Sequence, residues 1–251
     1  MSEKTLLAQR LTELANRSYN NNQYTFTNFL SVQELSEYYG MERELSFAGV
    51  TVFGGCDIAE RQMIRFGSEE NLGYVEEFPI TPILIKPLSS KFSDDLNHRD
   101  FLGALMNLGI KRETLGDIFV KGNEACLFCI DSMAEYITEN LTRIKHTTVI
   151  ASRDCDVSNI TEPILEDKII QVNSERIDAV IAKVYNLSRG DSLDLFPKNL
   201  VFLNGRLCTE NAKNLKAEDK VSVRGFGKFV FANVAGVSKK GKTNCLVRIY
   251  K

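Results

Sequence analysis

The apolar residues of this chain change their spacing several times, and each change marks a different element of secondary structure. Leu7, Leu11 and Leu14 follow a helical period that ends at three consecutive asparagines, whereas the apolar residues before Gly67 follow the two-residue period of a strand. Short patterns of both kinds alternate along the whole sequence. They predict an α+β protein of several small domains rather than one helical bundle or one large sheet.

Two pairs of side chains have the spacing of a helix-capping box. Ser31 and Glu34 predict the start of a short helix, and Gly40 stands where a left-handed residue would end it. Ser132 and Glu135 predict the start of a later helix in the same way. The apolar face of this second helix would cover a neighbouring sheet.

Prolines and turn residues divide the chain into three predicted domains. An apolar segment bounded by Pro79 and Pro87 begins a second domain, because proline is tolerated mainly at strand ends and edges. A strand over 164–172 would be the last of that domain. The predicted domains are an N-terminal α/β domain (1–75), a central α/β sandwich (76–173) and a C-terminal domain of two helices on a small sheet (174–251).

The charges are divided unevenly between the parts of the chain. From Arg176 onward there are 15 Lys and Arg residues against 6 Asp and Glu, a net charge of +9, whereas the preceding residues carry 16 basic and 27 acidic residues, a net charge of −11. A basic domain of this kind indicates a polyanionic partner, most often nucleic acid. An intramolecular contact between the two oppositely charged parts stays open as an alternative.

Membrane and secreted classes do not fit the composition. No apolar run reaches the roughly 18 residues that a membrane-spanning helix needs, and the first residues are polar without a signal-peptide core. Six cysteines without a regular spacing are typical of reduced thiols. We therefore expect a cytoplasmic, monomeric protein that binds neither a membrane nor a cofactor.

Two motifs that suggest chemistry lack the partners that the chemistry needs. Cys126 and Cys129 could hold a metal ion, but no second pair of ligands accompanies them, so packing inside an apolar strand is the simpler interpretation. The tripeptide His98-Arg99-Asp100 is similar to a kinase catalytic loop, but Leu105 stands where the metal-binding asparagine would be. We interpret the tripeptide as a helix start and assign no catalytic and no metal-binding residue.

Cations in the C-terminal domain stand at predicted helix starts and turns. Ser188 and Arg189 begin a helix, whose amide groups together with the hydroxyl and guanidinium would bind phosphate oxygens, and Asn204-Gly205 predicts a tight hairpin turn. Few aromatic residues accompany these cations, which favours structured RNA over single strands. The predicted RNA-binding residues are Arg176, Ser188, Arg189, Asn204, Arg206, Arg224 and Lys228, with a secondary patch of Lys239, Lys240 and Lys242.

The order of these elements, from Arg176 to Phe229, resembles the alpha-L RNA-binding motif, the small domain named after the fourth small-subunit ribosomal protein. The sequence departs from that motif at three positions. Pro197 lies in the last turn of the second helix, Asn199 replaces the usual helix-ending glycine, and Glu218 replaces a glycine before Asp219. Because asparagine tolerates a left-handed backbone, we expect the turn at Asn199 to be preserved.

The segments 98–113 and 115–118 resemble the middle-domain signature of YlmH-type proteins. This resemblance implies a bacterial-type cytoplasmic protein of three parts, with a central RNA-recognition-like sandwich and a C-terminal alpha-L domain. It also implies association with the large ribosomal subunit, binding of ribosomal RNA and peptidyl-tRNA during rescue of stalled nascent chains, and a cell-division gene neighbourhood. It assigns no chemistry to the signature residues.

Two other classes of function stay open. Alpha-L domains are also attached to RNA-modifying enzymes, including pseudouridine synthases, and to tyrosyl-tRNA synthetases, but the rest of this chain shows no nucleotide-binding or methyl-donor signature. A protein-interaction scaffold is the third class, in which the acidic part binds a partner. Salt dependence distinguishes RNA binding from a protein-interaction scaffold, because the affinity for RNA falls steeply with salt concentration when cations of the protein neutralise phosphates.

Overall fold

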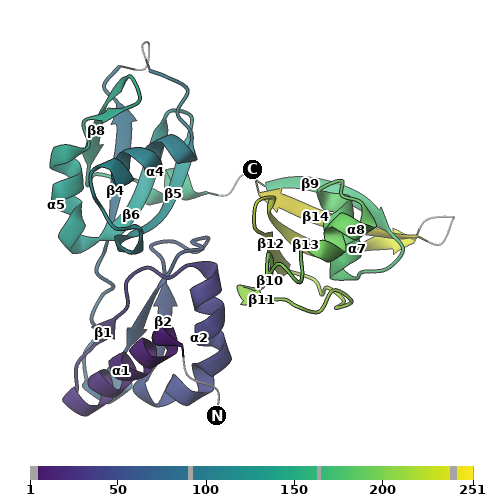
Figure 1. The fold of residues 1–251 in the computed structure, drawn as a ribbon, viewed down its shortest axis with the longest axis horizontal. Helices are drawn as coiled ribbons and strands as arrows, with labels where there is room; N and C mark the ends of the chain where they lie inside the picture. Colours follow the sequence, from purple (N-terminus) through teal and green to yellow (C-terminus); the bar gives the residue numbers. More distant parts are fainter. Residues whose placement is uncertain (1–4, 90–92, 163–164, 238–241, 251) are drawn as a thin grey trace. The chain divides into compact units, whose positions relative to one another are not determined.

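The computed structural model describes residues 5–89, 93–162, 165–237 and 242–250, and the chain forms two compact units, 1–162 and 163–251 (Figure 1). Helices and antiparallel sheets occur in both units, which confirms the prediction of an α+β protein. Among the described residues, no helix has both the length and the apolar character needed to cross a membrane.

The first part of unit 1 packs two helices on a three-stranded sheet of order β1-β3-β2. The predicted helical stripe forms: Leu11 and Leu14 are buried, and the hydroxyl of Thr5 caps the helix by accepting from the N–H of Ala8. The elements are α1 (Leu6–Asn21), β1 (Thr25–Phe26), α2 (Val32–Leu45), η1 (Ser46–Ala48), β2 (Val50–Phe53), β3 (Met63–Phe66) and α3 (Glu69–Leu72).

The predicted capping box at α2 is confirmed, but the predicted end of that helix is wrong. Ser31 accepts from the N–H of Glu34, whose carboxylate accepts from the N–H of Ser31. Gly40 lies inside the helix, because Met41 and Leu45 continue the buried face for another turn. The gain from burying these side chains outweighs the cost of a glycine in the helix.

The second part of unit 1 is a sandwich of two helices on a sheet of order β5-β6-β4-β8-β7. Strand, helix, two strands, helix and strand follow one another, and the first and third main strands are central, as in RNA-recognition-like folds. The elements are β4 (Ile80–Pro87), α4 (His98–Asn107), η3 (Arg112–Thr114), β5 (Leu115–Lys121), β6 (Glu124–Ile130), α5 (Asp131–Asn140), β7 (Arg143–Ile144), β8 (Thr147–Ser152) and α6 (Val157–Thr161).

The predicted capping box of Ser132 and Glu135 is wrong. The N-cap residue of α5 is Ile130, two residues before Ser132, and it makes no side-chain capping bond; the helix itself begins at Asp131. Asp131 instead accepts a hydrogen bond from the hydroxyl of Thr81 on β4. This tertiary contact fixes the start of the helix, which spacing alone does not reveal.

Unit 2 places two helices against a six-stranded sheet of order β11-β10-β12-β13-β14-β9. The two predicted helices and the strands of the C-terminal domain are present. The elements are β9 (Leu165–Val172), α7 (Ile177–Val184), α8 (Arg189–Asp194), β10 (Val201–Leu203), β11 (Arg206–Leu207), β12 (Asp219–Val223), β13 (Gly227–Val237) and β14 (Thr243–Tyr250).

The placement of the strand predicted over 164–172 in the central domain is wrong. That segment forms β9, which pairs antiparallel with β14 over its whole length, from Val172 opposite Thr243 to Leu165 opposite Tyr250. Its side chains Ile170 and Val172 join the core of unit 2. Apolar alternation identifies a strand but not its distant partner, so the boundary between the units lies before β9 rather than after it.

Candidate nucleic-acid interface

The guanidinium of Arg176 is bound to a buried carboxylate. Its Nε lies 3.0 Å from Oδ1 of Asp178 and a terminal nitrogen lies 2.7 Å from Oδ2, while the side chain of Asp178 is only 6% exposed. The backbone carbonyl of Asp178 accepts from the hydroxyl of Ser192 at 2.7 Å. The pair therefore neutralises a buried charge and connects the start of α7 with α8, which is a structural role for Arg176.

The helix predicted at Ser188 is confirmed, and Ser188 caps it. Its oxygen accepts from the N–H of Asp191 at 3.1 Å, and its hydroxyl donates to Oδ2 of Asp191 at 2.7 Å. The hydroxyl of Ser188 thus already donates a hydrogen bond inside the cap, and this bond competes with the predicted hydrogen bond to phosphate. Arg189, the first residue of the short helix α8, is exposed.

The hairpin predicted at Asn204-Gly205 is present between β10 and β11. Both residues have a positive φ, 51° and 77°, which is the signature of a type I′ turn. The side chain of Asn204 donates to Oδ1 of Asp219 and accepts from the N–H of Lys220, each at 2.8 Å. Asn204 therefore fixes the turn to β12, and the exposed Arg206 follows directly.

The other predicted cations lie in or near the last three strands: Arg224 in the turn between β12 and β13, Lys228 on β13 and Lys242 just before β14. Arg224 is exposed, and its backbone N–H donates to the carbonyl of Leu200 at 2.9 Å. Lys228 is half-buried, with its ammonium 5.0 Å from the ring centre of Tyr250. Lys242 is exposed, whereas Lys239 and Lys240 lie outside the described residues.

The predicted RNA-binding residues near the turns of unit 2 lie in two groups rather than one. The ring centres of Tyr185 and Phe226 lie 5.6 Å apart, so the turn that carries Arg224 lies beside the connection between α7 and α8. Asn204 and Arg206 lie at the opposite end of β10, because β10 runs antiparallel to β12.

Two of the departures from the alpha-L pattern are accommodated in left-handed backbone. Asn199 has a φ of 56°, as expected, and Glu218 has a φ of 68° at the position where the motif has glycine. The carboxylate of Glu218 is paired with Arg248, with a nitrogen–oxygen distance of 2.5 Å. The turn conformation that glycine usually supplies is therefore kept in both places.

The face of the central sheet that binds bases in RNA-recognition folds is buried here. On β6, Cys129 faces the helices, whereas Cys126 and Phe128 face the other side and pack with Phe29 and Met63 from the first part of unit 1. Both cysteines are buried, as predicted, and they face opposite sides of the strand. Phe128, whose ring would stack on a base in such a fold, is only 1% exposed.

Charged residues of the middle-domain signature hold the two parts of unit 1 together. Oδ2 of Asp117 accepts from the N–H groups of Glu60 and Arg61, at 2.5 and 3.1 Å. The side chain of Arg61 donates to the carbonyls of Leu115 and Phe29, each at 2.9 Å. Burial raises the pKa of Asp117 above its usual range. Sequence analysis assigned no role to these residues, and their role is structural.

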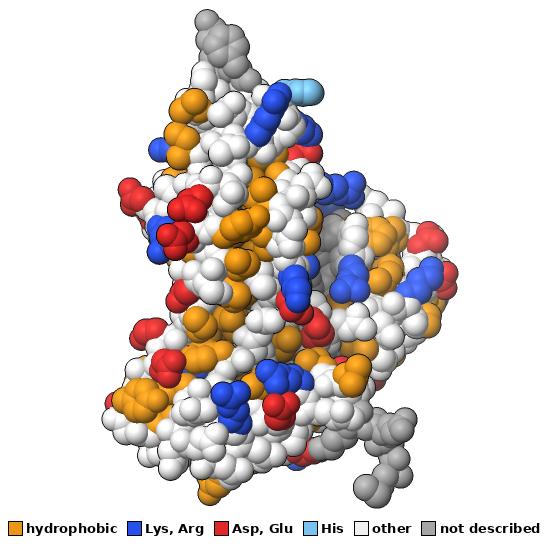
Figure 2. All heavy atoms as spheres, turned by 60° about the vertical axis from the view of Figure 1, so that its left-hand side comes forward, with side chains coloured by type: hydrophobic (Ala, Val, Ile, Leu, Met, Phe, Trp, Pro, Cys, Tyr) orange, Lys and Arg blue, Asp and Glu red, His pale blue; other side chains and the backbone are white. Residues whose placement is uncertain are grey.

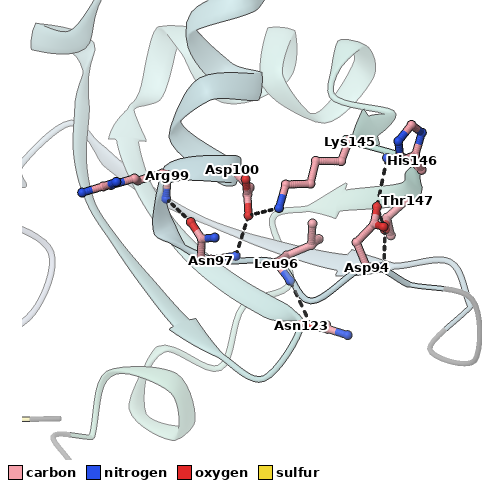
Figure 3. A network of polar contacts seen from close by, with 9 residues as sticks. All are labelled: Asp94, Leu96, Asn97, Arg99, Asp100, Asn123, Lys145, His146 and Thr147. Atoms are coloured by element: carbon pink, nitrogen blue, oxygen red, sulfur yellow. Dashed lines mark hydrogen bonds and ion pairs between the residues drawn. The ribbon is translucent and has the colours of Figure 1, made fainter.

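A second polar network surrounds the start of α4 and the turn between β7 and β8 (Figure 3). Asn97 caps α4 in a capping box with Asp100, which confirms the interpretation of the tripeptide as a helix start. Asp100 also accepts from the ammonium of Lys145 at 2.7 Å. Asp94 accepts from the N–H of His146 and from the hydroxyl of Thr147, each at 3.0 Å. Hydrogen bonding from these donors lowers the pKa of Asp94.

An open groove of about 580 Å³ lies beside this network, between α4 and the segment that joins α5 to β7. Figure 2 shows charged side chains of both signs, together with hydrophobic side chains, on the face that it presents. The groove is lined by Arg99, Asp100, Gly103, Ala104, Asn107, Leu108, Asn140, Leu141, Thr142, Arg143 and Lys145.

Comparison with known proteins shows that the central part of this chain is similar to a known RNA-binding domain. Residues 74–156 match the family described as "Putative RNA-binding domain in YlmH". This match covers the sandwich described above, so the central part of the chain is similar to the RNA-binding domain of YlmH-type proteins, as the signature segments predicted.

Among individual relatives, the chain is 29% identical over 196 residues to "Ribosome-associated protein quality control protein P2" of Bacillus subtilis (strain 168), which covers 77% of this chain and 75% of the relative. A solved structure of "Cell division protein ylmH from Streptococcus pneumoniae" matches with a TM-score of 0.47 and 14% identity, over 61% of this chain and 93% of that chain. The alpha-L assignment of unit 2 stays a prediction.

Proposed function

We propose that this chain is a non-enzymatic, cytoplasmic RNA-binding factor that docks on structured RNA, namely ribosomal RNA and tRNA bound to the large ribosomal subunit, in the rescue or quality control of stalled translation. The match of the central domain to an RNA-binding family is the observation that carries the proposal. The name of the Bacillus subtilis relative supports the ribosomal setting.

The basic segment of the chain supplies the cations for this role. Of the predicted residues, the exposed Arg189, Arg206 and Arg224 are the best placed for phosphate contacts. The side chains of Arg176, Ser188 and Asn204 hold neighbouring parts of unit 2 in place, so we assign them the role of positioning the contact residues. Because Arg206 lies at the other end of β10 from the turn that carries Arg224, the cations favour an extended RNA surface over a single phosphate pocket.

Co-sedimentation with separated ribosomal subunits across a salt series tests this proposal. The variant Arg189→Glu/Arg224→Glu changes the group beside the α7–α8 connection, and Lys213→Glu/Lys216→Glu makes the same change of charge at exposed positions elsewhere in unit 2. We expect salt-sensitive binding to the large subunit, with a slope that falls by about 0.7 to 0.9 for each phosphate that the first variant no longer neutralises. Equal losses of affinity in both variants would reduce the site to diffuse basic attraction, and no binding by the unaltered chain would refute the proposal.

A further inference from the structure

We propose that the groove between α4 and the α5–β7 segment binds the phosphate–sugar backbone of RNA, and that it replaces the buried sheet face as the RNA contact of the central domain. The inference rests on the proposed function, since it names a second RNA surface of the same protein. It places this surface on the helical side of the sandwich.

The base-binding face of the central sheet is closed in this protein. A side-chain carbon added at Gly55 would lie 2.8 Å from Cγ of Phe128, so the backbone of the first part of unit 1 lies directly on that ring. The segment around α6 packs against the same cluster through Val157 and Ile160. A base cannot stack on Phe128 unless this cover opens, so the domain needs another surface.

The lining of the groove carries more positive than negative charge. Arg99, Arg143 and Lys145 line it, against a single carboxylate, Asp100. Figure 3 shows Arg99 and Lys145 on either side of Asp100. Lys145 donates one of its three N–H groups to Asp100, and Nε of Arg143 donates to the carbonyl of Lys145 at 3.1 Å. These hydrogen bonds position the cations at the groove and leave further donors for phosphate oxygens.

Three residues of the groove disfavour their own local structure. Arg99 places a cation in the first turn of α4, where the helix dipole favours an anion. Gly103 stands inside the same helix, although a side-chain carbon there would meet nothing within 4 Å. Lys145 has a φ of 53°, a conformation usually taken by glycine or asparagine. Several residues that are unfavourable for their own secondary structure and lie in one place indicate a binding role.

The side chains that line the groove determine which kind of ligand it fits. Gly103 and Ala104 give the groove a low floor that admits the close approach of a backbone. Asn107, Asn140 and Thr142 add neutral donors and acceptors suited to ribose hydroxyls. None of the described lining residues is aromatic, so the groove offers no stacking platform. The arrangement fits phosphate and sugar recognition without reading of the base sequence.

The test is a fluorescence-anisotropy titration of the full chain with a fluorescein-labelled RNA stem-loop, repeated across a salt series. Two variants alter the groove: Arg99→Glu/Arg143→Glu removes two cations, and Gly103→Glu puts a carboxylate on its floor. The double variant Lys86→Glu/Lys111→Glu is the control for the first, because it makes the same change of charge at exposed positions outside the lining. Gly103→Ala is the control for the second, and circular-dichroism melting verifies that every variant folds.

We expect both groove variants to bind about tenfold more weakly, and the salt slope to fall by about one to two in the double variant, while both controls stay within about twofold of the unaltered chain. Gly103→Glu should melt at or above the temperature of the unaltered chain, since a better helix former replaces glycine. If the groove variants bind like their controls while Arg189→Glu/Arg224→Glu weakens binding, the groove inference is overturned and the proposed function stands. If the unaltered chain does not bind the stem-loop or ribosomal subunits, both fail.

Discussion

The closed sheet face gives a prediction about Gly55, whose backbone covers the ring of Phe128. In Gly55→Ala, the added methyl group would overlap that ring, and alanine would have to adopt a φ of +99°. The left-handed backbone costs about 1 to 2 kcal/mol, and overpacking against a fixed core side chain costs about 1 to 3 kcal/mol more. We therefore expect a total loss of about 2 to 5 kcal/mol in the free energy of unfolding.

Gly73→Ala is the matched control, because Gly73 has a φ of +79° but nothing within 4 Å of the added carbon. It carries the backbone cost alone, so the difference between the two variants measures the overlap with Phe128, about 1 to 3 kcal/mol. At roughly 2 to 4 °C per kcal/mol for a domain of this size, calorimetry of the full chain should show a difference of about 2 to 12 °C in the melting temperature of unit 1.

A local measurement accompanies the melting temperature. Cys126 lies under the same cover and is fully buried, so its rate of labelling by a thiol reagent, followed by mass spectrometry, reports opening of the sheet face. We expect faster labelling in Gly55→Ala than in Gly73→Ala. Equal melting temperatures and equal labelling rates in the two variants would show that Gly55 does not cover Phe128, and would remove the first step of the groove inference.

Three further predictions follow from single residues. Gly103→Ala should raise the free energy of unfolding by about 1 kcal/mol in urea titration, because the added carbon meets nothing and alanine favours the helix; a decrease would show an unseen steric overlap. Asp117→Asn should keep the bonds from two backbone N–H groups and stay within about 1 kcal/mol of the unaltered chain, whereas Asp117→Ala should be less stable by about 2 to 4 kcal/mol. Burial raises the pKa of Asp117, so the protonated carboxyl is favoured in the folded chain. Its contribution to the free energy of unfolding is therefore fully present below about pH 3.9 and is lost as the pH rises through the raised pKa. Urea titrations should show this loss of stability in the unaltered chain and not in Asp117→Asn. Burial also raises the pKa of Cys129 to about 12, so iodoacetamide at pH 8 should modify it only in unfolded chains, as read by mass spectrometry; rapid labelling of the native chain would contradict its burial.

Local signals in the sequence predicted local structure well. The turn at Asn204-Gly205 and the caps at Ser31 and Ser188 depend on neighbouring residues, and the structure contains all of them. The partner of β9 and the cover over Phe128 depend on residues far away in the sequence. No pattern within a short window carries that information, so these two features had to come from the structure.

The candidate site shows the same division. Exposure of Arg189, Arg206 and Arg224 agrees with their predicted position at helix starts and turns. Sequence places Arg176 two residues before Asp178, but only the structure shows that the two form an ion pair with a buried carboxylate. The groove has a signal in the sequence, since Arg99 and Gly103 stand one turn apart inside a predicted helix.

The pairing of β9 with β14 also determines the order in which unit 2 can be completed. β9 is the first strand of the unit to be synthesised, and its partner is the last. Until β14 leaves the ribosome, the nascent chain carries β9 without its neighbour, as an unpaired strand with an exposed isoleucine at Ile169. A chain that stops before β14 therefore presents a free strand edge, so unit 2 reaches its native sheet only after synthesis has passed its final strand.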